Sequence, residues 1–430
     1  MLTRNDSSLA VPHVGGRLAV VVFIFTLLAF VVESQLTQYV QTNLHYRHPF
    51  FLFYLVHSTF SLIFPLHILY LTTTTQYSAS SLLKGLSIAI THHLTPRDAP
   101  RPHRFPRAAF IKLVSLLTIG VTYPGLLWFA AVSLASVSDV TAIWNTNAFF
   151  AYIISVKLFK LKWEARKILA VSLATLGTVA VVYGGASSEE SPSTLSPSPS
   201  STPQSSPPAA TFIKPTAPVL GNLLTLVASL GYGLYQVLYK IYAALPTDPE
   251  VTSDANYEQI AQQDEDSELD AEEAASLAAA ASSSGASGDE AANAAAVAGL
   301  YPPPFGLHPN LITSIIGLLT FSVLWIPLPF LHVTGLEPFA LPPDFLTAIS
   351  ILGIALGGMV FNAGFMILLG IWGPIITSVG NLLTIVLMLI SDSIFGSGLE
   401  SLTFWSLLGS GVIVVAFGIL TYDMVSAPRG

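Results

Sequence analysis

One apolar stretch of the sequence, residues 218–240, carries polar side chains at helical spacing. From Asn222 they recur every three or four residues, and those best suited to hold a solute are Ser229, Tyr232 and Gln236. This spacing puts them on one face of a helix. Tyr232 offers an aromatic surface and Gln236 an amide, so we expect this face to line a solute-binding cavity. The alternative is hydrogen bonding between helices, which also places polar residues on a buried face.

Four more polar residues lie in apolar stretches, where they are costly unless they face protein or water. Trp144 and Asn145 lie in one stretch, and Asn362 and Asn381 lie in two others. We expect all four to contribute to the same solute site. Two alternatives stay open, namely that Trp144 belongs to the aromatic belt at the membrane surface and that the amides bond backbone at helix crossings.

Glu33 is a carboxylate within a long apolar stretch, and polar residues follow it in the same stretch. We hypothesise that it couples protons or binds a cation, the alternative being a structural, solvated carboxylate. No Lys or Arg lies near the middle of any predicted membrane span. Fixed positive charge or a helix N-terminus would be expected to meet a phosphate. The sequence therefore favours a neutral or cationic organic solute.

Motifs of soluble catalysis are missing from the sequence. The ten histidines form no metal-binding pattern, and there is no HExxH, no P-loop and no GxSxG with partners. The chain also has no cysteine, which excludes disulfides and thiolate-bound metals. We therefore expect no enzyme activity, no cofactor, no bound metal and no direct use of ATP.

The elements that position these residues must be membrane helices. Only 10% of the residues are charged, against about 25% in soluble proteins, while 52% are hydrophobic. This composition excludes a soluble enzyme, a disordered protein and a nucleic-acid binder. The apolar residues fall into runs of about 20, the length of a membrane span. We place ten spans at 18–40, 49–71, 108–134, 137–159, 166–184, 218–240, 309–331, 345–370, 373–395 and 401–423.

Charge distribution orients these spans. An even number puts both termini on one side, and 15 of the 17 Lys and Arg residues then lie on that side. Positive charge marks the cytosolic side of membrane proteins. We therefore predict an integral, multi-pass protein with both termini in the cytosol.

The spans divide the chain into two five-helix units joined by polar segments. The segment 245–307 holds thirteen of the 25 acidic residues and no Lys or Arg. Its composition, like that of the Ser/Pro-rich linker, predicts disorder. The predicted parts are a cytosolic tail 1–17, a first repeat 18–184, a linker 185–217, a second repeat 218–423 interrupted by the cytosolic loop 245–307, and a cytosolic tail 424–430.

The two units match each other in sequence. A shift of 236 residues takes Asn145 to Asn381 and keeps one register through two spans, and a two-residue deletion then pairs Gly177 with Gly411. Because each unit has five spans, the second enters the membrane inverted relative to the first. Inverted repeats are typical of secondary transporters, which bind solute near the midplane. The predicted fold is an all-α membrane protein with ten transmembrane helices in two inverted five-helix repeats.

Four segments carry a resemblance to a known family: 138-SDVTAIWNTNAFFAYIISVKLFK-160, 221-GNLLTLVASLGYGLYQVLYK-240, 335-GLEPFALPPD-344 and 373-GPIITSVGNLLTIVLMLISDSIFG-396. They resemble the drug/metabolite transporter superfamily with EamA-type repeats, in particular the solute carrier 35 subfamily F and the fungal vacuolar and thiamine-repressible transporter-like proteins. The resemblance implies a secondary transporter of a small organic solute. It also implies an endomembrane location, vacuolar or Golgi, with the plasma membrane left open.

Two other functions stay open at this point. One is an antiporter of nucleotide sugars or other phosphorylated metabolites. The other is a non-transporting membrane scaffold that acts through the acidic loop 245–307. The expected partners are a small-molecule solute and membrane lipid, without nucleic acid, while a homodimer and a protein partner at the acidic loop are left open. Substrate, coupling ion and direction of transport are not encoded in any recognisable motif.

Overall fold

The structure is a computed structural model, and helices make up 86% of the residues that it describes, with no strand among them. The predicted linker 185–217, the acidic loop 245–307 and both tails lie almost wholly outside those residues. The described residues are 16–75, 77–95, 105–135, 137–159, 163–186, 217–245, 303–395 and 403–426.

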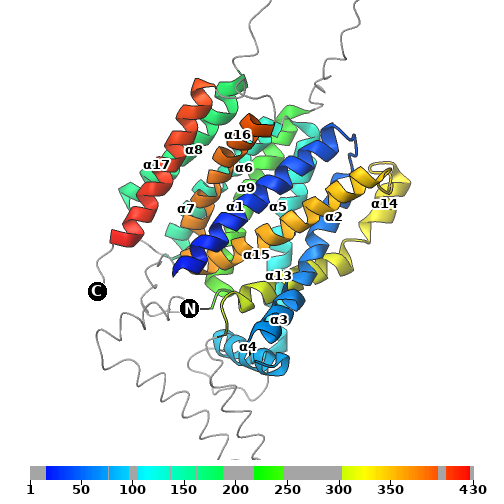
Figure 1. The fold of residues 1–430 in the computed structure, drawn as a ribbon, viewed down its shortest axis with the longest axis vertical. Coiled ribbons are helices and arrows are strands. Elements are labelled where there is room, and N and C mark those ends of the chain that lie inside the picture. The colour runs from blue at the N-terminus through cyan, green and yellow to red at the C-terminus, as the bar shows by residue number, and fades with distance from the viewer. Residues whose placement is uncertain are drawn as a thin grey trace, which may run out of the picture.

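The helices of the first half are coloured from blue through cyan to green in Figure 1. They are α1 (Gly16–Thr42), α2 (Pro49–Thr59), the short 3-10 helix η1 (Phe60–Leu62), α3 (Ile63–Thr74), α4 (Ala79–Leu94), α5 (Arg107–Leu134), α6 (Val137–Asn145), α7 (Asn147–Leu158) and α8 (Ala165–Ala186).

The second half repeats this pattern of long and broken helices. Its helices are α9 (Pro218–Tyr242), α13 (Leu307–Val323), α14 (Pro327–Thr334), α15 (Phe345–Asn381), α16 (Leu383–Phe395) and α17 (Phe404–Ser426).

Several of these helices have the length and composition of membrane spans. Five helical segments qualify, and a sixth does if α13 and α14, which bend by 46° at Pro327, count as one span. Their outward side chains are apolar, as on α1, where Phe25 is 61% exposed and Val32 is 50% exposed. The chain therefore has the makeup of a multi-pass, membrane-embedded protein.

Helix α15 is interrupted about three quarters of the way along its length, at Gly373. Gly373 has φ 77° and ψ 174°, and Pro374 follows it. A positive φ is accessible to glycine because it lacks a Cβ, and proline cannot donate the helical hydrogen bond at the next position. The chain therefore turns between two helical pieces at this point.

Two further breaks are 3-10 turns at which the backbone stays helical, with φ −64° at both and ψ −8° and −19°. Thr146 separates α6 from α7, and Leu382 separates α15 from α16. At each break the intervening residue donates its N–H to the carbonyl three positions back, Ile143 in one case and Val379 in the other, both at 3.1 Å. Its own carbonyl then accepts from the N–H three positions further on, at 3.0 Å and 3.1 Å. The two breaks are 236 residues apart, the shift seen in the sequence.

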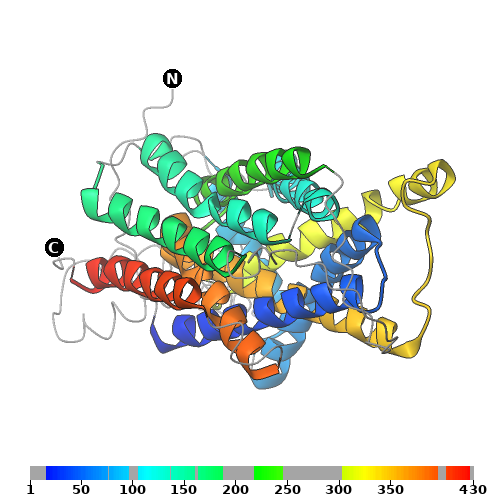
Figure 2. The same ribbon diagram turned by 90° about the horizontal axis from the view of Figure 1, so that it is seen from above.

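Helices α8 and α17 pack side by side along one flank of the bundle, as Figures 1 and 2 both show. A Cβ on Gly177 would lie 2.8 Å from the Gly409 carbonyl oxygen and 3.0 Å from Ile413. A Cβ on Gly409 would lie 2.4 Å from the Gly177 carbonyl oxygen and 2.7 Å from Val181. Glycine is thus needed on both helices for the backbones to approach this closely.

The segment between α14 and α15 holds the start of α2. The Glu337 carboxylate accepts hydrogen bonds from the N–H groups of Phe50 and Phe51, each at 2.9 Å. A carboxylate at this position satisfies free helix donors and complements the helix dipole. Nearby, the Tyr46 hydroxyl donates to the Ala340 carbonyl at 2.8 Å. Burial and the Glu337 charge raise the pKa of Tyr46 to about 12.

Helix α4 lies between the predicted spans 49–71 and 108–134, where we predicted no helix. Ser78 caps its start by accepting from the Ser81 N–H at 3.2 Å. Its buried face packs against Leu307 at the start of α13. The signal was present in the sequence as apolar residues at helical spacing on that face: Leu82, Leu86 and Ile90.

Candidate functional site

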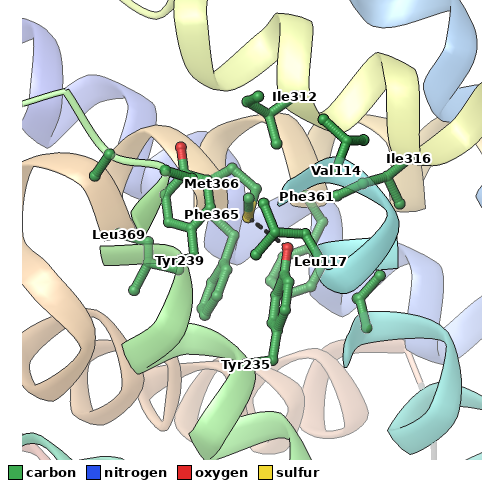
Figure 3. Packing of buried hydrophobic residues seen from close by; sticks show 13 residues of the cluster. Val114, Leu117, Tyr235, Tyr239, Ile312, Ile316, Phe361, Phe365, Met366 and Leu369 are labelled. Atoms are coloured by element: carbon green, nitrogen blue, oxygen red, sulfur yellow. Dashed lines mark hydrogen bonds between the residues drawn. The ribbon is translucent and has the colours of Figure 1, made fainter. Parts of the chain in front are cut away.

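The helices of the two halves meet in a buried centre formed by α5, α9, α13 and α15 (Figure 3). The Tyr235 ring of α9 points toward α15, and its hydroxyl lies 3.1 Å from the Met366 sulfur. Phe361 and Phe365 of α15 line the same space, with ring centroids 5.5 Å apart. This core fixes the height and rotation of α9 relative to α15, and so positions the polar face of α9.

The structure brings two predicted site residues together. Trp144 at the end of α6 and Tyr232 on α9 have ring centroids 4.9 Å apart at an interplanar angle of 32°. Tyr232 also lies 5.9 Å from the Phe365 ring. Both Trp144 and Tyr232 are half-buried. They form an aromatic surface that joins α6, α9 and α15.

Ser229 is one turn before Tyr232 on α9 and is fully buried. Its hydroxyl donates to the Trp144 carbonyl at 3.2 Å and lies 2.9 Å from the Thr146 hydroxyl. These groups belong to the break between α6 and α7. Ser229 therefore serves to bind α9 to this break, as the alternative interpretation of the polar stripe predicts.

Gln236 is also fully buried, and both ends of its amide contact protein. Its Nε2 donates to the Asn147 Oδ1 at 3.2 Å, and its Oε1 lies in hydrogen-bond contact with the Ser378 hydroxyl. Asn147 in turn donates to the Trp144 carbonyl at 2.8 Å. This set of bonds joins α7, α9 and α15. Ser378 was not predicted as a site residue, because its sequence context resembles any hydroxyl in an apolar helix.

The three predicted asparagines are separated from one another. Asn145 is buried at the end of α6, and Asn381 occupies the matching position at the end of α15. Asn362 donates to the Gly358 carbonyl of its own helix at 2.9 Å. Among the described residues, no hydrogen bond or ring contact joins Asn362 or Asn381 to the Trp144–Tyr232 pair.

Glu33 lies inside the contact between α1 and α15. A Cβ on Gly357 would be 3.2 Å from the Glu33 Cβ, and a Cβ on Gly358 would be 2.9 Å from its Oε1. The two glycines therefore make room for this side chain. Its Oε2 is buried and has no hydrogen-bond partner among the described residues.

An unpartnered carboxylate within a helical bundle is costly. A buried charge requires a counter-charge, a proton or several hydrogen bonds to offset the loss of water. In native structures, a buried polar atom without a partner points to an unseen ion, water or functional role. Within the part of the chain that the structure describes, no group of three or more His, Asp or Glu could hold a metal ion. The Glu33 carboxyl therefore needs a proton, a counter-charge or further hydrogen bonds to offset its burial.

Comparison with known proteins shows a likeness of fold. No family model matches the chain, and no curated protein matches it. Sixteen chains of solved structures match, among them one titled only "Crystal structure of protein". That match covers 96% of this chain and 99% of the other, at 12% identity and a TM-score of 0.50. At this identity the likeness concerns the fold alone.

Proposed function

We propose that the chain is a secondary transporter that moves a small organic solute, neutral or cationic, across an endomembrane by alternating access. Its proposed architecture is ten transmembrane helices in two inverted five-helix repeats. The observation that carries the proposal is the pair of helix breaks at Thr146 and Leu382, which share one backbone geometry and one sequence shift. A 3-10 turn within a longer helix often marks a functional hinge. The resemblance to EamA-type transporters points the same way.

The count of ten spans is supported by helix lengths. The apolar helical segment Phe345–Ser391 has 47 residues. As a continuous helix it would be about 70 Å long, more than twice the roughly 30 Å of a hydrocarbon core. The turn at Gly373 divides it into two pieces of suitable length. Helices α6 and α7 together, α8 with 22 residues and α9 with 25 residues would supply the other spans.

The inverted repeat is supported by helix packing. The pair α1 and α15 corresponds in the repeat to α9 and α5, and both pairs pack extensively. Helices α8 and α17 correspond to each other, and their contact is reciprocal. Gly177 faces Gly409 and Ile413, while Gly409 faces Gly177 and Val181. This reciprocity pairs Gly177 with Gly409, rather than with Gly411, which has nothing within 4 Å.

The hydrogen bonds of Gln236 suggest how the two halves would move together. Asn147 is next to the first break, and Ser378 lies four residues before the second. A 3-10 turn has poorer hydrogen-bond geometry than the α-helix around it, so it can absorb a change of direction at lower cost. In the proposed mechanism, Gln236 connects the two breaks, and Tyr232 with Trp144 presents the surface that meets the solute.

The first test is a thermal-shift screen of the full-length protein in detergent. The panel contains nucleotide sugars, nucleosides, thiamine, amino acids, polyamines and simple sugars. A ligand at about 100 times its dissociation constant should stabilise the protein by about 2.7 kcal/mol. We expect a hit that Tyr232→Ala removes, while Leu234→Ala, on a 40% exposed residue of the same helix, retains it.

The second test is counterflow in proteoliposomes preloaded with the unlabelled hit. We expect labelled hit to accumulate inside, and accumulation to survive deletion of residues 246–302, which leaves Leu307 and the rest of α13 in place. A ligand that binds without counterflow would overturn the transporter proposal in favour of a scaffold. A phosphorylated hit would instead favour the antiporter alternative. If Glu33 couples protons, Glu33→Gln should remove the pH dependence of counterflow, and an unchanged pH profile would refute that role.

A further inference from the structure

Aromatic rings follow one another through the centre of the bundle. The series begins at Phe30 on α1, continues through two phenylalanines of α15, and reaches Tyr232, Trp144 and then Trp128 on α5. Successive ring centroids in this series are 4.7 to 6.3 Å apart. Through a neighbouring ring of α5 it ends at Phe53 on α2. The rings thus come from α1, α15, α9, α6, α5 and α2.

The two ends of this series lie on helix faces that also carry Glu33 or a residue packed close to it. Phe30 is three residues before Glu33, so the two share a face of α1. Phe53 is likewise three residues before Val56 on α2. A Cβ on Gly358 would lie 2.6 Å from the Val56 Cγ1 and 2.9 Å from the Glu33 Oε1, so both atoms pack against this glycine. The aromatic series and this carboxyl therefore close around the same central region, with Tyr232 at its middle.

The chemistry of this region matches an organic cation. The carboxylate has a buried oxygen without a partner, and among the described residues no ion pair reaches Glu33. Aromatic faces attract cations, with Trp strongest, followed by Tyr and Phe. A metal cation such as Na⁺ would need several oxygen ligands. The surroundings of the carboxyl offer glycine, valine and rings instead, which suit the alkyl groups of an ammonium ion.

We propose that the solute of this protein is an organic ammonium ion, bound with its positive charge at the Glu33 carboxylate and its apolar body against Tyr232 and Trp144. This inference rests on the proposed transport function only where it assumes that the bound ammonium ion is released on the other side of the membrane. Binding itself depends on the site alone.

The test measures binding by titration calorimetry on the full-length protein in lipid nanodiscs. The probes are tetramethylammonium, phenyltrimethylammonium and benzyltributylammonium, with tert-butylbenzene as the uncharged isostere of the second. We expect at least one ammonium probe to bind and tert-butylbenzene to show no more uptake than in empty nanodiscs. If none of the three probes binds, or if the uncharged isostere binds as well as its ammonium partner, the proposal is overturned.

The variants separate the carboxylate from general effects of mutation. Glu33→Gln should weaken ammonium binding at least tenfold, while Glu164→Gln, at an exposed carboxylate paired with Lys167, should leave it unchanged. Tyr232→Leu should weaken it about five-fold, as expected for loss of one cation–π contact. Full binding by a folded Glu33→Gln variant would overturn the proposal.

If Glu33→Gln fails to fold, a second pair of variants changes the α15 surface against which the Glu33 carboxyl packs. Gly358→Ala places a methyl group against the Glu33 Oε1, whereas Gly370→Ala on the same helix meets nothing within 4 Å. We expect the first to weaken binding and the second to retain it, and equal affinities would count against the proposal.

Binding and counterflow separate this inference from the transport proposal. Ammonium binding at Glu33 without counterflow would retain the site and overturn transport. Counterflow of a solute with which no ammonium probe competes would retain transport and overturn the ammonium site.

Discussion

The contact between α8 and α17 and the contact between α1 and α15 are both built on glycine, but they differ in symmetry. At α8 and α17, each helix contributes a glycine that faces the carbonyl of the other, and the flanking side chains are reciprocal. At α1 and α15, glycines are on α15 only, and they make room for a carboxyl group on α1.

The related contact in the other half shows what has changed. Aligning the ends of α1 and α9, at Thr42 and Tyr242, pairs Glu33 with Gly233. A Cβ on Gly233 would lie 3.0 Å from the Ala151 nitrogen of α7, so this position serves close packing of α9 against α7 and does not face α5, the proposed counterpart of α15. One half thus carries a carboxylate where the other carries a glycine at a helix contact.

This difference separates the contacts that stabilise the fold from the groups proposed to bind the solute. Equivalent residues in two repeats can stabilise equivalent contacts, and such contacts need no charge. A binding site for one asymmetric solute needs groups that only one repeat supplies. The residues proposed to hold the solute, Glu33 and Tyr232, occupy positions where the proposed repeats diverge, consistent with sites being added to folds.

The largest expected effect is on the scaffold. Gly409→Ala should lower the free energy of unfolding by about 3 kcal/mol, because its methyl group would overlap the Gly177 carbonyl, a backbone atom that cannot rotate away. Gly411→Ala should be neutral or stabilise by up to about 1 kcal/mol, since alanine is the better helix former. Denaturant titration in mixed micelles measures both. Equal effects would mean that the reciprocal contact is not what holds α8 against α17.

Most of the fold could be predicted from hydropathy, because apolar runs of span length leave few alternatives to a helix. Three predicted spans, at 18–40, 108–134 and 401–423, correspond to α1, α5 and α17 with ends that differ by a few residues. The packing register of α8 on α17 could not be predicted. It depends on which glycine meets which backbone, and several glycines satisfy the sequence repeat equally well.

The candidate site was predicted in part. Helical spacing identified Tyr232 and Gln236 as members of one face, but spacing cannot distinguish a free amide from one bonded at both ends. The structure shows that Gln236 is bonded at both ends. Glu33 was identified by its type alone, and its seat on Gly357 and Gly358 depends on a contact between segments more than 300 residues apart in the chain.

A smaller effect is expected at the connection between the two helix breaks. Gln236→Met keeps the volume but removes both hydrogen bonds, leaving the buried Asn147 amide short of a partner. It should lower the free energy of unfolding by about 1–2 kcal/mol, whereas Leu234→Met on the exposed side of α9 should change it by less than about 0.5 kcal/mol. Because we place the solute at Glu33, ammonium affinity should stay within about threefold. If Gln236→Met lost ammonium affinity while its free energy of unfolding stayed unchanged, Gln236 would have to be counted among the residues that contact the solute.

The smallest effect is expected outside both regions, at the start of α15. The Asp344 Oδ1 accepts from the Thr347 N–H at 2.7 Å, and this hydrogen bond holds the pKa of Asp344 below its usual range. A depressed pKa means that the stabilisation is present at neutral pH and is lost as the pH falls through the folded-state pKa. Asp344→Ala should therefore be slightly less stable than wild type at pH 7 and converge with it in acid. Asp344→Asn retains a capping oxygen without charge and should show no such convergence. Because Asp344 is distant in sequence from Gly358 on the same helix, neither variant should change ammonium affinity. A change would show that the centre responds to the end of α15 and is not confined to the carboxyl and its rings.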